Sequence, residues 1–138
     1  MPHPIAKKDF PVSNVRHFLE PGPIVLVSSQ WQQHTNIMTM GWHMVMAFSP
    51  SLLGCVIDAG NHSHALVCNS GECVINIPSA SLVDKVVGIG NCSGSEIDKF
   101  KAFELTPGKS EKVGAPRIEE CYASFECRLH DDAMIERY

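Results

Sequence analysis

The sequence lacks three features that define large classes of protein: a long apolar run, a cluster of basic residues and paired-cysteine motifs. No window approaches the roughly 20 consecutive apolar residues that span a bilayer. Residues 1–8 carry charge with no apolar run after them, so no secretion signal is expected. The formal net charge is -4, whereas a surface that follows nucleic-acid or lipid phosphates needs an excess of Lys and Arg. We therefore expect a cytoplasmic protein that binds neither nucleic acid nor membrane.

The six cysteines form no CxxC motif and no pair with the spacing of zinc ligands. In a reducing cytoplasm they are expected to remain thiols. His62 and His64 have a spacing that metal sites use, but no further His, Cys or acidic pair completes a recognisable ligand set. The sequence thus predicts no metal site.

Motifs of covalent catalysis and of nucleotide binding are also missing. Ser70-Gly71 is not the turn that presents a nucleophilic serine, and no cysteine has the sequence context of an activated thiolate. The glycine-rich segment GIGNCSG (88–94) follows a predicted helix, whereas the dinucleotide fingerprint and the phosphate-binding loop both follow a strand. No catalytic protein residue is therefore predicted.

The composition describes one globular domain that spans residues 1–138, because 44% of the residues are apolar and only 19% are charged. Hydrophobic periodicity predicts strands over residues 23–29, 36–48, 52–58, 73–77 and 120–129. The long strand 36–48 would place one continuous apolar face on Met38, Met40, Trp42, Met44, Met46 and Phe48.

Short helices are predicted between these strands. The first covers residues 63–69, with Ser63 as its N-cap and Ser70-Gly71 as its end. The second begins at Ser79 or Ser81 and ends at Gly88 to Gly90, with an apolar face of Leu82, Val83, Val86 and Val87. The third covers 95–103, with Ser95 as its N-cap.

Strands joined by short connections, with too few helices to cover both faces of a parallel sheet, favour an antiparallel β-barrel with short helices in its connections. A doubly wound parallel sheet fits less well. The segment 106–114 is interpreted as a surface loop within the domain. Residues 134–138 read as the start of a strand with no terminator, so we expect the chain to lack a C-terminal segment. If the barrel needs that segment to close, either an edge strand is exposed here or a partner chain covers it.

The most informative polar segments are HTNIMTMGWHMVMAFSP (34–50) and NHSH (61–64), which combine amides, hydroxyls, thioethers, an indole and imidazoles. Such a mixture suits a large, flat, partly polar ligand. A helix that begins near Ser63 would offer backbone N–H groups and a positive dipole end to an anion such as phosphate. Alternatively, Ser63 only caps the helix while His62 and His64 are solvated.

In order and spacing, seven segments resemble those of the flavin reductase-like, FMN-binding split-barrel family, most closely its flavoredoxin branch. The matching segments are PGPIVLV (21–27), TNIMTMGWH (35–43), FSP (48–50), NHSH (61–64), ECVINIP (72–78), GNCSG (90–94) and DKF (98–100). The resemblance implies a homodimeric split β-barrel with FMN near the subunit interface and no Rossmann domain. The family usually continues past the position of Tyr138, which implies that the chain lacks the C-terminal strand or strands and the tail.

The resemblance also implies cofactor contacts for ten residues: Asn36, Met38, Thr39, Trp42, Ser49, Asn61, Ser63, His64, Lys99 and Phe100. Asn36, Met38 and Thr39 would face the ring and the ribityl chain, with Trp42 farther along. Ser49 would lie near the ribityl chain or phosphate, and the segment 61–64 would bind the phosphate. Lys99 and Phe100 would approach the cofactor from a helix; alternatively, Lys99 is solvated and Phe100 belongs to the core.

Two functions follow from the resemblance. The first is an enzyme, an NAD(P)H-dependent flavin reductase in which flavin N5 carries the chemistry, which agrees with the lack of a predicted nucleophile or metal. The second is an electron carrier that exchanges electrons with a redox protein partner and has no direct NAD(P)H activity. A third reading, a barrel that has lost flavin, accounts less well for the polar segments.

Overall fold

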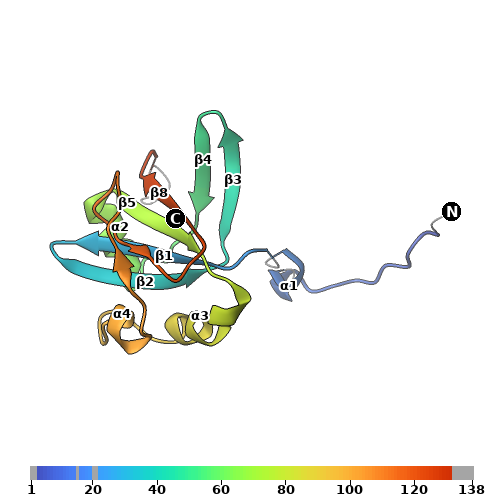
Figure 1. Ribbon diagram of the computed structural model, residues 1–138. Helices are drawn as coiled ribbons and strands as arrows, with labels where there is room; N and C mark the ends of the chain where they lie inside the picture. Colours follow the sequence, from blue (N-terminus) through green and yellow to red (C-terminus); the bar gives the residue numbers. More distant parts are fainter. Residues whose placement is uncertain (1–2, 15, 20–21, 132–138) are drawn as a thin grey trace.

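Four antiparallel strands form the main sheet of the protein in the order β2-β1-β5-β8 (Figure 1). The computed structural model describes residues 3–14, 16–19 and 22–131. The sheet consists of β1 (Val25–Trp31), β2 (His34–Met40), β5 (Glu72–Ile77) and β8 (Ala123–Arg128). Its strands confirm the predicted segments 23–29, 73–77 and 120–129, with ends that differ by a few residues.

A tight turn joins β1 to β2. Gln32 and Gln33 both have positive φ angles, 49° and 66°. This left-handed conformation at both central residues is what a two-residue type I′ hairpin requires. The turn sets a register in which Trp31 pairs with His34 and Leu26 with Thr39. The hairpin thereby decides which residues of β2 face each side of the sheet.

Helices cover one face of this sheet, where α3 and α4 lie below it in the view of Figure 1. After β5 the chain forms a 3-10 turn, η2 (Ala80–Leu82), then α3 (Val83–Gly90) and α4 (Lys99–Ala102). The first core cluster lies here and consists of Leu26, Ile37, Val86, Ile89, Phe100, Leu105 and Ile118. Near the N-terminus the described residues include η1 (Val12–Asn14) and α1 (Arg16–Leu19).

The opposite face of the sheet carries the second core cluster, Val25, Val27, Met38, Met40 and Ile75. Ile57, Cys73, Ile77 and Cys127 pack against it and are partly buried. Because successive residues of a strand point to opposite faces, β2 contributes Ile37 to the first cluster and Met38 to the second. Helix α2 (His62–Ser70) leads into β5 and packs against β1 and β2.

A separate two-stranded sheet consists of β3 (His43–Phe48) and β4 (Ser51–Cys55), which project from the main sheet as a hairpin (Figure 1). The predicted single strand 36–48 is therefore wrong. β2 stays paired with β1 through Met40, whereas β3 pairs with β4, so the chain must leave the main sheet at Gly41 and Trp42. The predicted apolar face is divided accordingly: Met38 and Met40 are buried, but Met44, Met46 and Phe48 are exposed.

The N-caps of two helices differ from the prediction. The N-cap of α2 is Asn61 and not Ser63, while Gly71 ends the helix in the left-handed conformation, at φ 70°, as expected. Helix α4 begins at Lys99 with Asp98 as its N-cap, so Ser95 caps no helix. In both cases the cap is the polar residue directly before the first helical residue.

The buried face of α3 also differs from the predicted one. Val86 and Ile89 are buried and Leu82 packs beside them, whereas Val83 and Val87 are exposed. The spacing of Leu82, Val86 and Ile89 is that of one helix face. The sequence pattern alone allowed either face, and contact with the sheet selects this one.

The predicted fold class is confirmed, because the structure is mainly β, with antiparallel sheets and short helices in the connections. Within the segment 106–114, Gly108 and Ser110 are buried, and β6 (Pro107–Gly108) pairs with β7 (Arg117–Ile118). This segment is thus only partly a surface loop. The predicted strand start at 134–138 lies outside the described residues. Among the described residues, no helix is long and apolar enough to cross a membrane.

Candidate functional site

A buried hydrogen bond joins two of the predicted site residues. Asn36, on β2, donates from Nδ2 to Oγ of Ser63, on α2, over 2.8 Å. Asn36 is 2% exposed and Ser63 is fully buried. Buried side-chain amides and hydroxyls are costly unless they find partners, so this bond fixes the start of α2 against the edge strand of the main sheet.

Asn61 determines where α2 begins. Its Oδ1 accepts a hydrogen bond from the backbone N–H of Ser63 at 2.9 Å, and its carbonyl oxygen accepts one from the N–H of His64 at 3.0 Å. These two bonds use N–H groups of the first turn that would otherwise be free for an anion. Ser63 therefore contributes its side chain to the contact with Asn36 and does not cap the helix.

Lys99 brings a positive charge into the same region. Its side chain is 5% exposed, and Nζ donates to the carbonyl oxygens of Ile37 at 2.9 Å and Ile89 at 3.0 Å. Burial lowers the pKa of Lys99, and the nearby Cys92 opposes this shift. Within the described residues no carboxylate pairs with Lys99. An ammonium group has three N–H donors. The two carbonyl oxygens therefore leave one donor of Lys99 unused, and no carboxylate of the described residues neutralises its positive charge.

The other amide atom of Asn36 is unsatisfied. Oδ1 is buried and has no hydrogen-bond partner in the structure. It lies against Gly94, in the connection between α3 and α4, where a Cβ would overlap it. The site therefore contains a buried acceptor without a donor, next to a position where only glycine leaves enough room.

Two imidazoles meet beside this cluster. Nε2 of His34 and Nε2 of His62 are 2.6 Å apart, and the two rings are nearly perpendicular, at 88°. Burial lowers the pKa of His62, and the positive charges of His34 and Lys99 lower it further. The ring of His64 instead lies 3.8 Å from Sγ of Cys68, one turn along α2.

Some predicted site residues have other partners within the chain. Thr39 donates its hydroxyl to the carbonyl oxygen of Val86 at 2.7 Å, and Phe100 belongs to the first core cluster. Met38 packs in the second core cluster. The alternative reading of Phe100 as a core residue is confirmed, while the reading of Lys99 as solvated is wrong because its side chain is buried.

The remaining two predicted site residues lie elsewhere. Trp42 is half exposed where the chain passes from β2 to β3. Ser49 and Pro50, which a cis peptide bond joins, form the turn of the β3–β4 hairpin, and Ser49 is exposed. The hairpin points away from the main sheet in Figure 1. The structure thus brings Asn36, Ser63 and Lys99 together but does not bring Ser49 to them.

Comparison with known proteins decides the family. The family model described as "Flavin reductase like domain" matches residues 16–137, nearly the whole chain. The chain belongs to the flavin reductase-like family. An uncharacterised protein of Archaeoglobus fulgidus is 36% identical over 118 residues, which are 86% of this chain and 66% of that protein. Membership supports a flavin-linked redox role in general terms.

Solved structures support the fold of this flavin reductase-like chain. Flavoredoxin of Desulfovibrio vulgaris (Miyazaki F) superposes with a TM-score of 0.78 at 24% identity, over 95% of this chain and 68% of that one. A Shewanella frigidimarina protein, whose structure is described as containing a split barrel domain, superposes with a TM-score of 0.74 at 19% identity, over 86% and 63%. The chain therefore spans about two thirds of the length of these relatives.

Sequence reasoning missed two residues of the site in this flavin reductase-like chain. Gly94 belongs to the matching segment GNCSG (90–94) but was assigned no role in the site, although it packs against Asn36. His34 lies two residues before Asn36 and therefore on the same face of β2, which was the available indication. In each case the partner lies far away in the chain, so the sequence pattern did not identify it.

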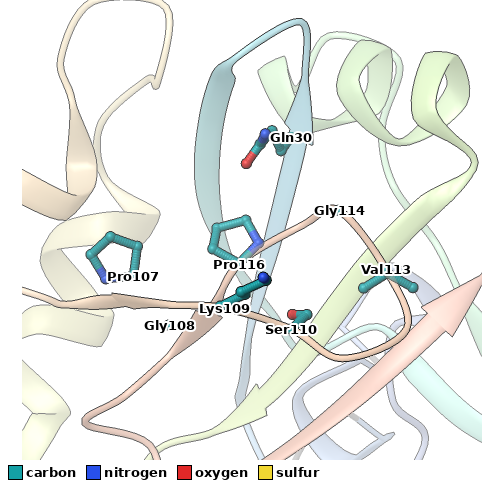
Figure 2. A pocket seen from close by; sticks show the side chains of 8 residues that line it. All are labelled: Gln30, Pro107, Gly108, Lys109, Ser110, Val113, Gly114 and Pro116. Atoms are coloured by element: carbon teal, nitrogen blue, oxygen red, sulfur yellow. The ribbon is translucent and has the colours of Figure 1, made fainter.

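A surface depression of the flavin reductase-like chain lies away from this cluster. It has a volume of about 340 Å³, and Figure 2 shows it between Gln30 and the loop that carries Lys109, Ser110 and Pro116. None of the ten predicted cofactor residues lines it. It also has no aromatic residue that a flat ring could stack on, so we place the candidate site at Asn36, Ser63 and Lys99.

The chain shows no candidate metal centre in the described part. Residues 3–14, 16–19 and 22–131 include no group of three or more His, Cys, Asp or Glu side chains that could hold a metal ion. His34 and His62 meet as a pair only. The site instead combines a buried ammonium group with a hydrogen-bonded amide and hydroxyl.

Proposed function

We propose that this chain binds FMN at the cluster of Asn36, Ser63 and Lys99 and transfers electrons from NAD(P)H through the flavin to an acceptor. Two neighbouring groups carry the proposal. In the part of the chain that the structure describes, the buried ammonium of Lys99 has no carboxylate partner, and the buried Oδ1 of Asn36 accepts no hydrogen bond. A ligand with an anionic group could neutralise Lys99, and its N–H or O–H groups could donate a hydrogen bond to Asn36. Membership of the flavin reductase-like family supports FMN as that ligand.

The chemistry of these residues fits FMN. A phosphate carries a charge of about -1.5 to -2 near neutral pH, and Lys99 offers a desolvated ammonium with one unused donor. The flavin ring and the ribityl chain carry N–H and O–H groups that can donate to Oδ1 of Asn36. Asn61 already occupies two backbone N–H groups at the start of α2, so we assign the charge compensation mainly to Lys99 and less to the helix end.

The other predicted residues have supporting roles in the proposal. Asn61 and His64 shape the start of α2, and Met38 offers a thioether on the side of β2 that carries Asn36. Thr39 and Phe100 hold α3 and α4 against β2. Trp42 and Ser49 would contact the cofactor only if the β3–β4 hairpin, or a hairpin of a second copy, lies over the site.

The protein's part in the reaction is to bind and to orient. When bound, FMN supplies a ring that can accept a hydride and release electrons singly or in pairs. Asn36 would fix the position of a ring or ribityl donor, and Lys99 would neutralise the phosphate. Burial of both side chains would keep water from these contacts. We propose no catalytic protein residue.

A second candidate function is an electron carrier that takes electrons from a redox protein and not from NAD(P)H. Two observations favour it: the superposition on a flavoredoxin, and the exposed apolar side chains of the β3–β4 hairpin. Met44, Met46 and Phe48 are exposed there, and Phe48 is 92% exposed. Apolar side chains that gather on a surface are typical of a protein-protein contact.

We also propose that the chain forms a homodimer. The same hairpin residues would be covered by a second copy, which would remove them from water and place the hairpin near the partner's flavin. The resemblance to the family and the exposure of the hairpin support this assembly. The dimer and the contact with a redox partner are alternatives for the same surface, and the mass of the protein in solution distinguishes them.

One experiment tests the function directly. The purified protein is titrated with FMN while its absorbance spectrum is recorded, and NADPH or NADH is then added without oxygen. A shifted flavin band that bleaches with stoichiometric nicotinamide oxidation supports the reductase. A bound band that bleaches only with a reduced redox protein supports the carrier, and no spectral change with FMN contradicts both.

A further inference from the structure

Two cysteines lie directly opposite each other on neighbouring strands of the main sheet. Cys73, on β5, and Cys127, on β8, are paired positions of antiparallel strands. Their Cα atoms in such a pair are about 4.5 or about 5.5 Å apart, depending on the hydrogen-bonding type. A disulfide joins Cα atoms that are roughly 4.4–6.8 Å apart. The backbone therefore holds the two thiols within the reach of one S–S bond.

The two side chains lie on the same face of the sheet, and their thiols interact. Both point to the face of the second core cluster and pack against it, partly buried. A hydrogen bond between the two thiol groups raises the pKa of Cys73 and lowers the pKa of Cys127. Burial raises the pKa of Cys73 further and acts against the shift of Cys127. Cys127 is consequently the member of the pair that more readily becomes the thiolate, which is the reactive form.

A third thiol completes the group. Cys55, at the end of β4, is exposed and interacts electrostatically with Cys127 and Cys73. Partial desolvation by the surrounding chain raises the pKa of Cys55, and the neighbouring Cys127 raises it further. The three cysteines come from β4, β5 and β8, so they meet only in the folded protein. The described residues contain no three-ligand metal group, and metal binding is thus not the chemistry that this cluster indicates.

We propose that Cys73 and Cys127 form a redox-active dithiol that reacts with low-molecular-weight disulfides, RSSR, of which oxidised glutathione is an example. The Cys127 thiolate attacks one sulfur of RSSR, which breaks the R–S–S–R bond, forms a mixed disulfide on Cys127 and releases one RS⁻. The Cys73 thiol then loses its proton and attacks Sγ of Cys127, which forms the Cys73–Cys127 bond and releases the second RS⁻. In sum, two protein thiols and RSSR give one protein disulfide and two RSH.

The sheet limits how stable this bond can be. Cβ atoms of directly opposed residues are about 4.5–5.5 Å apart, whereas a relaxed disulfide requires about 3.5–4.5 Å. The strands must therefore approach slightly, and a bond formed under such strain is easily reduced again. This geometry distinguishes a reversible dithiol from a permanent structural bridge. The closed bond would tie the last described strand, β8, to β5.

The test uses the wild-type protein with oxidised glutathione as the probe. The protein is incubated with the disulfide, the remaining thiols are alkylated, and the digested protein is analysed by mass spectrometry. We expect a peptide in which Cys73 is linked to Cys127, and its loss after dithiothreitol. The midpoint of thermal unfolding should rise by about 5–10 °C in the oxidised protein, because the bond closes a long loop of the unfolded chain.

Variants separate the two steps. In Cys73→Ser the second step is blocked, so a glutathione adduct on Cys127 should persist. In Cys127→Ser only Cys73 can react. Its adduct should form more slowly than the adduct on Cys127 forms in Cys73→Ser. Cys68→Ser, which removes an exposed thiol on α2, should leave the linked peptide unchanged. Far-ultraviolet circular dichroism checks that each variant is folded.

Three results would overturn the proposal. One is glutathione adducts on Cys55 and Cys68 of the wild-type protein without any linked Cys73–Cys127 peptide. Another is a linked peptide that joins Cys55 to Cys127. The last is a Cys73–Cys127 bond that forms only in denaturant. None of these results depends on FMN, so the dithiol and the proposed flavin function stand or fall separately.

Discussion

Gly94 and Asn36 touch so closely that a Cβ on residue 94 would overlap Oδ1 of Asn36. The contact joins the connection before α4 to the edge strand of the main sheet, although residues 36 and 94 are 58 positions apart in the sequence. It encloses the one amide atom of Asn36 that has no hydrogen-bond partner. The candidate cofactor site therefore depends on the absence of a side chain as much as on the side chains present.

Gly94→Ala is expected to displace the Asn36 side chain and to weaken FMN binding by about tenfold or more. Overpacking a close contact also destabilises a protein by about 1–3 kcal/mol. FMN titration and urea unfolding measure the two effects. Gly114→Ala is the matched control, because a Cβ there meets no atom within 4 Å, and it should change neither quantity. Equal affinities of both variants would contradict a site at Asn36.

Lys99→Met should reduce FMN affinity by about 10–100-fold, the loss expected for a hydrogen bond to a charged group. Riboflavin, which lacks the phosphate, should bind the variant and the wild type with the same affinity if Lys99 acts on the phosphate. Both titrations can follow flavin fluorescence. Lys101→Met, which removes an exposed charge from the same helix, is the control. An equal loss for FMN and riboflavin would assign Lys99 a structural role instead.

Ile89→Ala should lower the free energy of unfolding by about 2–4 kcal/mol, because it leaves a cavity under α3 in the first core cluster. Val87→Ala, on the exposed side of the same helix, should change it by less than about 0.5 kcal/mol. Urea denaturation of both variants makes the comparison. Similar losses would mean that the helix packs through the face that the sequence pattern first indicated.

Glu120 should make the protein more stable at neutral than at acidic pH. Burial acts to raise the pKa of its carboxyl group, but hydrogen bonds from the N–H and hydroxyl of Thr106, both 2.8 Å, outweigh it and lower the pKa. A carboxyl whose pKa is lower in the folded state contributes stability above its unfolded pKa and loses it as the pH falls through the folded pKa. The carboxyl is largely exposed, so the contribution should be below about 1 kcal/mol.

Urea unfolding of the wild type and Glu120→Gln at pH 7 and near pH 3 measures this contribution. The variant should be less stable than the wild type at pH 7, and the difference should shrink at the lower pH. Glu119→Gln serves as the neighbouring control, because its carboxylate contacts Arg117 and not Thr106. A difference between wild type and Glu120→Gln that stays constant with pH would contradict the assignment.

Phe48→Glu tests the proposed dimer. A charge on the exposed apolar hairpin should reduce the mass measured by light scattering from two chains to one, because a buried and unpaired carboxylate is costly. Val83→Glu places the same charge on an exposed apolar position of α3 and should leave the dimer intact. A wild-type mass of one chain, or dissociation by both variants, would count against the hairpin as the interface.

Local pattern was enough for most elements of the fold. Alternation and β-branched residues predicted β1, β5 and β8, and Gly71 correctly predicted the end of α2. Local pattern failed where one long strand and two shorter strands would show the same alternation of residues. The segment 36–48 alternates without interruption, so only the different partners of β2 and β3 reveal the break at Gly41.

The candidate site was predicted residue by residue but not as an arrangement. Asn36, Ser63 and Lys99 were each expected near the cofactor because their segments resemble those of the family. Their contacts could not be expected, since Lys99 bonds to backbone carbonyls of β2 and α3 and not to another side chain. Ser49 lies in a segment with an equally good resemblance, yet the structure places it on a separate hairpin.

The sequence by itself determined the fold class, the family and the absence of a membrane-spanning run, because these depend on composition, on short-range periodicity and on the order of local motifs. The tertiary structure alone decided which atoms lack partners. The unpaired charge of Lys99, the unsatisfied Oδ1 of Asn36 and the meeting of Cys55, Cys73 and Cys127 each require strands and helices that are distant in the chain to pack together. Such contacts follow from sheet order and register, which no single segment of this chain encodes.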